Sequence, residues 1–228
     1  LGMPGAALVL GAAMIIVVVP LAVLVLQVTP AGAAGQMVEP TPRRDLMRRG
    51  AFITISAAFA LGLFAQIGLF AHLIVRLTPD FGAVVGAAAV SVVTVFAIFG
   101  RTVLAWLLGG RDRRLAMAAS LSMQAVGSVF LAMGDGPLPL ALGCVLFGLG
   151  VGNLTSMMPL IVQNEFRPAD VGTVVALVTA INQAVFALAP GAFGWLRDLT
   201  ESYSVAFLIA GAVQLVAALV LAMGRRYS

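Results

Sequence analysis

The chain has 228 residues, of which 61% are hydrophobic and only 10% are charged. A soluble domain carries about a quarter charged residues, so this composition, with a mean hydropathy of +1.10, excludes that class and predicts a lipid bilayer as the main solvent. The net charge of +4 comes from arginine alone, since the sequence contains no lysine. All the arginines except Arg101 lie outside the apolar stretches, at or between their ends, which indicates membrane topology rather than nucleic-acid binding.

Seven apolar segments are each long enough to cross a hydrocarbon core of about 30 Å, which takes about 20 helical residues. The pattern predicts an all-α polytopic membrane protein with seven transmembrane helices. In chain order the segments are 4–26, 51–75, 83–108, 115–133, 138–162, 172–195 and 204–223.

The connection over residues 27–50 differs from the other, shorter connections. It combines Pro, Gly and Ala with four arginines, a composition typical of a mobile linker. We therefore expect three parts: a single helix at 1–26, this linker, and a six-helix bundle at 51–228.

The arginines also predict the orientation of the helices. If the helices alternate, ten of the 13 basic residues fall on the side of the linker and the C-terminus, and the positive-inside rule makes that side cytoplasmic. Residue 1 then lies outside, and the run 4–26 is too long for a signal peptide. We therefore expect that further helices precede this chain in the complete protein.

One stretch of the sequence resembles a known family. Residues 100–114, GRTVLAWLLGGRDRR, resemble the loop between the eighth and ninth helices of the major facilitator superfamily, although Gly109 stands where the family usually has aspartate. Residues 66–82 resemble the end of the family's seventh helix in the bacterial monocarboxylate and oxalate/formate porter branch. Residues 190–207 resemble the family's eleventh helix and its exit. The resemblance implies that the chain comprises the sixth helix, the central cytoplasmic linker and the complete C-terminal half.

The resemblance implies secondary transport of a small solute by alternating access in a bacterial inner membrane. The branch implies an organic anion such as a monocarboxylate, with a coupled proton. Two alternatives remain open: efflux of hydrophobic compounds by the same superfamily, and a non-transporting seven-helix membrane protein. A retinal protein is excluded, because a retinal Schiff base needs a lysine amine.

Arg101 is the candidate for anion binding, because it lies inside an apolar segment, where a guanidinium costs about 3 kcal/mol. All nine acidic residues lie in loops or at helix ends, so the segments offer no obvious counter-ion. In the porter branch, an arginine at the matching place contacts the substrate carboxylate. The alternative is a gating or snorkelling role at the cytoplasmic boundary.

Four amide side chains complete the predicted substrate-binding set. In the family, the helices that carry them border the central cavity, and sites of this kind lie near mid-membrane. The alternative is that they hold neighbouring helices together. They are Asn153, Asn182, Gln66 and Gln183.

His72 is the only histidine and is a candidate for proton coupling, because imidazole titrates near neutral pH. Arg111, Arg113 and Arg114 are candidates for a cytoplasmic gate. The glycines of residues 143–153 lie in an apolar helix with no strand before them, so they do not predict a nucleotide site. With no visible pairing of nucleophile and base, we expect neither an enzyme nor a metal or cofactor site.

Overall fold

The computed structural model describes residues 39–108 and 112–224, together with residues 8, 12, 15–17, 19 and 20. The chain divides into two compact units, Leu1–Glu39 and Pro40–Ser228. In the first unit, the described residues between 8 and 20 are helical. The rest of the predicted helix 4–26 and residues 27–38 of the linker lie outside the described residues.

The second unit is built of helices, and its described residues contain no strand. The all-α polytopic fold is therefore confirmed. The helices are α2 (Arg43–Arg48), α3 (Gly50–Leu108), α4 (Arg113–Met133), α5 (Pro137–Gly150), α6 (Asn153–Glu165), α7 (Pro168–Phe186), α8 (Ala189–Thr200) and α9 (Tyr203–Met223).

Six stretches of the described residues are long and apolar enough to cross a membrane, and they correspond to the last six predicted spans. Helix α3 contains two of them, α5 with α6 forms one, and α7 with α8 forms another. They are Gly50–Pro79, Phe81–Leu104, Arg113–Met133, Pro137–Glu165, Pro168–Thr200 and Tyr203–Met223.

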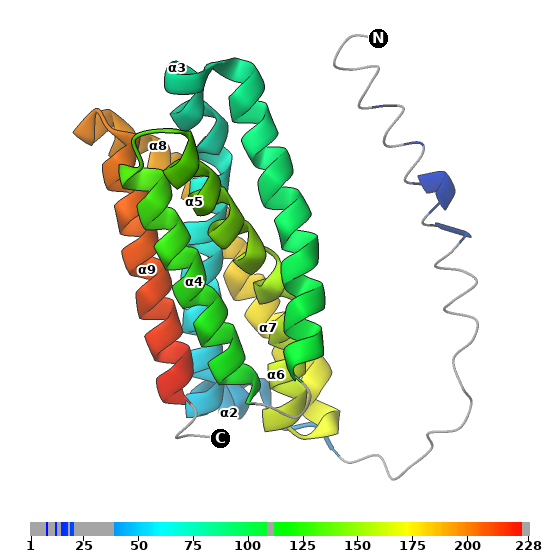
Figure 1. Ribbon diagram of the computed structural model, residues 1–228. Helices are drawn as coiled ribbons and strands as arrows, with labels where there is room; N and C mark the ends of the chain where they lie inside the picture. The colour runs from blue at the N-terminus through cyan, green and yellow to red at the C-terminus, as the bar shows by residue number, and fades with distance from the viewer. Residues whose placement is uncertain are drawn as a thin grey trace. The chain divides into compact units, whose positions relative to one another are not determined.

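Helix α3 reverses direction near its middle. The backbone leaves helical geometry at Gly82, where φ is 80° and ψ is 161°, a region that residues with a Cβ rarely adopt. Figure 1 shows α3 leaving the end of the bundle that carries α2, turning at the far end and returning as a second arm. The turn falls in the connection that its Pro, Asp and Gly predict.

A second break separates α5 from α6 within a single span. Gly152 adopts the left-handed conformation, with φ 82° and ψ −12°, and Val151 precedes it in an extended conformation. The sequence predicts one continuous helix over 138–162, whereas the structure has two helices joined at residues 151–152. Such discontinuous helices are a common feature of transporter sites.

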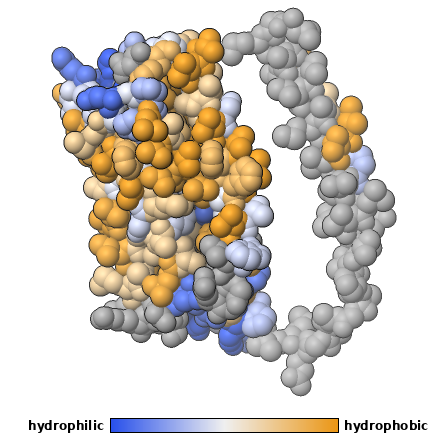
Figure 2. Space-filling model, in the orientation of Figure 1, coloured by the Kyte–Doolittle hydropathy of each residue, from blue (hydrophilic) through white to orange (hydrophobic). Residues whose placement is uncertain are grey.

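Two apolar clusters form the core of the bundle. One includes Leu46, Phe59 and Ile161, and the other includes Leu69, Phe147 and Phe207. Helix α4 packs against α9 and α5, and α3 packs against α9, α5 and α7. Figure 2 shows that apolar side chains also cover much of the visible outer face, as expected for a surface in contact with lipid.

Two spans are much less covered than the others. Only 17% of the most apolar window is buried in Phe81–Leu104 and in Pro168–Thr200, against 44–56% in the other four spans. The second arm of α3 and the α7–α8 span therefore form the exposed flanks of the bundle.

Candidate functional site

Arg101 lies on the second arm of α3, and its side chain is exposed. Its guanidinium packs against Gly152 so closely that a Cβ there would collide with Nη2 and Nε. Gly152 therefore has two reasons to be glycine: its left-handed backbone and the arginine that occupies the space beside it. Arg101 is thus held at the junction of α5 and α6.

A close backbone contact holds the second arm of α3 at this junction. A Cβ on Gly100 would overlap the backbone carbonyl of Leu149, and one on Gly148 would come within 2.8 Å of the Val93 carbonyl oxygen. The second arm of α3 and α5 therefore touch backbone to backbone. This contact fixes the place of Arg101 along the membrane-spanning helices.

No carboxylate of the described residues pairs with Arg101. Ion pairs among those residues include Arg114 with Glu165, Arg167 with Asp170 and Arg197 with Asp198. Arg101 has no polar partner among the described residues. A guanidinium offers five donors in a planar fork that matches a carboxylate. The arrangement leaves that fork available to an anion.

Asn153, the first residue of α6, lies beside Gly152 and is only 2% exposed. Its Nδ2 donates to Ser120 Oγ at 2.9 Å and to the Leu149 carbonyl at 3.0 Å, while its Oδ1 has no hydrogen-bond partner. Of the predicted site residues, the structure therefore brings Arg101 and Asn153 together around one glycine.

The other three predicted amides lie on other parts of the bundle, the first arm of α3 and α7. Gln66 on α3 and Asn182 on α7 are buried, and Gln66 Oε1 and Asn182 Oδ1 both lack a hydrogen-bond partner. Gln183 is exposed on α7. An unpaired buried amide oxygen is costly, so Gln66 and Asn182 are the two that invite a further polar partner.

Sequence reasoning missed a buried polar ladder between α4 and α9. Ser128 Oγ donates to Gln214 Oε1 at 2.8 Å, and Gln214 Nε2 lies 3.5 Å from Gln124 Oε1. Ser120, Gln124 and Ser128 recur every four residues on α4, so the helical period could have predicted this face. Its hydrogen bonds join α4 to α9, which indicates a role in packing.

His72 is half-buried on the first arm of α3 and contacts α8 and α9. Its Nε2 lies 3.0 Å from the Pro190 carbonyl oxygen, and its ring centroid is 5.5 Å from that of Tyr203. A carbonyl only accepts, so Nε2 carries the proton in this contact. The histidine thus connects the first arm of α3 with two other spans, in the part of that arm nearer to the turn at Gly82.

The three candidate gate arginines have different environments. Arg114 is 3% exposed, and its Nε and Nη2 donate to the two Glu165 carboxylate oxygens at 2.5 and 2.7 Å. Arg113 Nη1 donates to the Leu160 carbonyl at 2.5 Å. Arg111 lies outside the described residues. Arg114 and Arg113 therefore fasten α4 to the end of α6.

A polar contact that the sequence does not predict holds the end of the linker. The Thr41 N–H and Oγ donate to the two Asp170 carboxylate oxygens at 2.7 and 2.9 Å. Arg167 Nε donates to Asp170 Oδ2 at 3.0 Å. The compact unit therefore starts at Pro40, whereas the sequence places the start of the bundle at residue 51.

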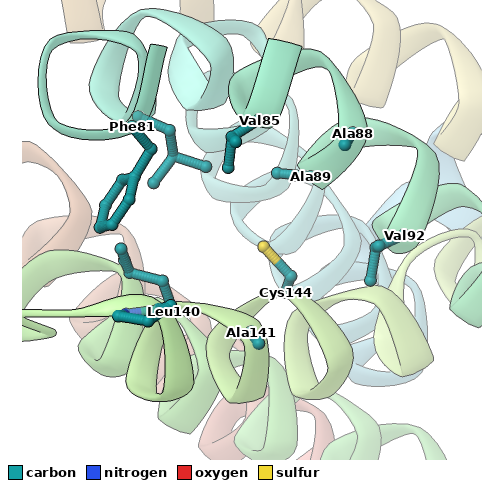
Figure 3. A pocket seen from close by; sticks show the side chains of 10 residues that line it. Phe81, Val85, Ala88, Ala89, Val92, Leu140, Ala141 and Cys144 are labelled. Atoms are coloured by element: carbon teal, nitrogen blue, oxygen red, sulfur yellow. The ribbon is translucent and has the colours of Figure 1, made fainter. Parts of the chain in front are cut away.

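An apolar pocket lies between the turn of α3 and α5 (Figure 3). Its volume is about 190 Å³, and Phe81, Val85, Leu140 and Cys144 are among its lining residues. The described residues contain no group of three or more His, Cys, Asp or Glu side chains that could hold a metal ion. The pocket is suited to an apolar group rather than a charged one.

Comparisons with known proteins bear on the family. No curated protein sequence matches the chain. A solved structure, the in meso crystal structure of the POT family transporter PepTSo, is similar with a TM-score of 0.68 and 16% sequence identity. The match covers 82% of this chain and 38% of the transporter chain, so at this low identity it shows a shared fold over part of a longer protein.

The sequence profile of the Major Facilitator Superfamily matches residues 1–190, which confirms the predicted superfamily but not the monocarboxylate and oxalate/formate branch. The profile match extends from residue 1 across both arms of α3 and the Arg101–Gly152 junction. The chain belongs to the Major Facilitator Superfamily.

Proposed function

We propose that the protein is a secondary transporter of a small organic anion, such as a monocarboxylate, and that it works by alternating access. In this proposal Pro40–Ser228 is the C-terminal bundle, which rocks against helices that precede it around a central site. The observation that carries the proposal is Arg101, a guanidinium within a membrane span that has no acidic partner among the described residues.

The surroundings of Arg101 favour an anion over a purely structural role. A snorkelling arginine would extend toward the headgroups, whereas this guanidinium is packed on Gly152. An ionisable group within the membrane normally faces a partner or a water-filled cavity. A carboxylate at Arg101 would supply the missing partner by two parallel hydrogen bonds.

The amides have supporting roles in this proposal. Asn153 already donates both of its Nδ2 hydrogens, to Ser120 and to the Leu149 carbonyl, so beside the anion it would act only through Oδ1, as an acceptor from a bound water. Gln66, Asn182 and Gln183 would line the path of the substrate. The unpaired oxygens of Asn153, Gln66 and Asn182 support this assignment, because a buried amide oxygen gains stability from a donor on the substrate or on a bound water. Arg111, Arg113 and Arg114 would form the cytoplasmic gate.

The test is uptake or efflux of radiolabelled monocarboxylates by the full-length protein in proteoliposomes. Arg101→Gln should reduce transport by about 100-fold, because it removes charge-assisted hydrogen bonds worth about 1.5–3 kcal/mol. Arg101→Lys should retain partial transport, since it keeps the charge but not the fork. Arg43→Gln, an exposed arginine on α2, is the control, and unchanged transport by Arg101→Gln would refute the proposal.

Proton coupling through His72 is a separate part of the proposal. Protonation at Nδ1 would charge the ring and strengthen the hydrogen bond that Nε2 donates to the Pro190 carbonyl, and it would thereby affect the packing of α3 against α8. His72→Gln keeps a donor at this place but cannot titrate, so transport should lose its dependence on a proton gradient. An unaltered pH profile would remove His72 from the coupling step.

A second candidate function is efflux of hydrophobic compounds, which the apolar pocket of Figure 3 favours. Ala88→Phe would fill this pocket and should abolish efflux of a lipophilic dye while sparing carboxylate transport. Suppose that Ala88→Phe affects only dye efflux and that Arg101→Gln affects only carboxylate transport. The wild-type rates of dye efflux and carboxylate transport then identify the main cargo.

A further inference from the structure

A second cavity, of about 240 Å³, lies next to the contact between Arg101 and Gly152, since Gly100, Leu149 and Asn153 are among its lining residues. Three elements form it: the second arm of α3, α4, and the junction of α5 and α6. Val103, Leu104, Ala119 and Met123 give it apolar walls, and Ser120 and Asn153 are its polar side chains. No charged side chain of the described residues lines it, so it differs in chemistry from the neighbourhood of Arg101.

The hydrogen bonds of Asn153 show which of its polar atoms, among the lining of this cavity, has no partner. Nδ2 uses both of its donor hydrogens, one on Ser120 Oγ and one on the Leu149 carbonyl. The contact with a carbonyl fixes the orientation of the amide, because an amide oxygen could not lie there as a donor. Oδ1 is therefore the free atom of a side chain that is 98% buried, and it is an acceptor.

We propose that this cavity is a binding site for a small uncharged molecule with an apolar body and one O–H or N–H donor. The apolar walls would cover the body, and the donor would satisfy Asn153 Oδ1. An engineered apolar cavity of about 150 Å³ binds benzene, so 240 Å³ has room for an aromatic ring with one polar substituent. An ion is disfavoured, because the described walls offer no opposite charge.

The site goes beyond the proposed transport function, because its ligand need not be the cargo. The second arm of α3 and the α5–α6 junction both line the cavity, and both hold Arg101 in place. A ligand that fills the cavity would therefore brace this contact. We expect it to act as a modulator of the protein rather than as a competitor for Arg101.

The test compares two probes that differ by a hydroxyl group, benzyl alcohol and toluene. Saturable binding to the purified full-length protein is measured by saturation-transfer difference NMR. Benzyl alcohol should bind at least tenfold more tightly than toluene, because only the alcohol can donate to Asn153 Oδ1. Equal binding of the two probes would refute the hydrogen bond to Asn153.

Variants locate the binding within the molecule. Ala119→Leu should abolish saturable binding of benzyl alcohol by filling the cavity, while Ala212→Leu, on the exposed face of α9, should leave it unchanged. Asn153→Leu should remove the preference for benzyl alcohol over toluene. Ala119→Leu keeps the test decisive if Asn153→Leu does not fold. Saturable binding that survives in Ala119→Leu, or no saturable binding in the wild type, overturns the proposal.

Discussion

Arg114 and Glu165 lie 51 residues apart and form a buried ion pair with two hydrogen bonds, of 2.5 and 2.7 Å. Arg114 also donates to Thr54 Oγ1 at 3.1 Å and to the Leu221 carbonyl at 3.2 Å. One side chain on α4 thereby connects the starts of α3 and α4 with the ends of α6 and α9.

Breaking this pair should destabilise the bundle strongly. Arg114→Gln leaves Glu165 as an unpaired buried charge, which costs about 3–5 kcal/mol, and it should lower the melting temperature of the detergent-solubilised full-length protein. The matched control is Arg197→Gln, because Arg197 and Asp198 form an exposed pair worth at most about 1 kcal/mol. Similar shifts for the two variants would contradict a structural role for the buried pair.

Gly152→Ala should disturb the junction of α5 and α6. The new Cβ would collide with the guanidinium of Arg101, and the left-handed backbone costs a residue with a Cβ roughly 1–2 kcal/mol. Thermal unfolding should show the loss of stability. Gly172→Ala is the control, since a Cβ there meets no atom within 4 Å. Adding Arg101→Ala to Gly152→Ala should recover only the part of the lost stability that is due to the collision.

Thr41→Val should loosen the start of α2 while leaving the bundle folded. It removes the Oγ–H donor to Asp170 but retains the backbone N–H. A hydrogen bond to a charged group contributes about 1.5–3 kcal/mol, so trypsin should cleave after Arg43 at least about tenfold faster. Thr78→Val, which loses only a bond within α3, should not change this rate. Equal cleavage of wild type and Thr41→Val would show that Asp170 does not hold the linker.

The orientation predicted from the arginines can be tested by labelling. Asp45 on α2 and Asp135 between α4 and α5 are both exposed, and the predicted topology places them on opposite sides of the membrane. In a Cys144→Ser background, a membrane-impermeant maleimide should label Asp135→Cys in intact cells and Asp45→Cys only after the cells are broken. The reverse pattern would invert the orientation and place the C-terminus outside.

The spans were predictable because their length and hydropathy are local properties of the sequence. Six predicted segments correspond to six apolar stretches of the structure, and the turn of α3 falls where Pro79 and Gly82 predict it. The break at Gly152 was not predictable, because several glycines lie between residues 143 and 153 and only the contact with Arg101 distinguishes this one.

The candidate site was predictable only in part. Arg101 attracts attention as a charge inside an apolar segment, and Asn153 as an amide in mid-helix. Both residues lie beside Gly152 because of the way the second arm of α3 packs against α5 and α6. The spacing of residues in the sequence does not predict this packing. Arg113 and Arg114 are neighbours in the sequence, yet only Arg114 is buried on Glu165, because successive helical residues point about 100° apart.

The contact between Thr41 and Asp170 also limits how much of the predicted linker 27–50 could act as a tether. An extended chain spans at most about 3.5 Å per residue. A tether running from residue 27 to residue 50 could reach about 84 Å, whereas one that ends at residue 40 reaches about 49 Å. Asp170 therefore sets the working length of the predicted linker, and a change at this one carboxylate would lengthen that linker without inserting a residue.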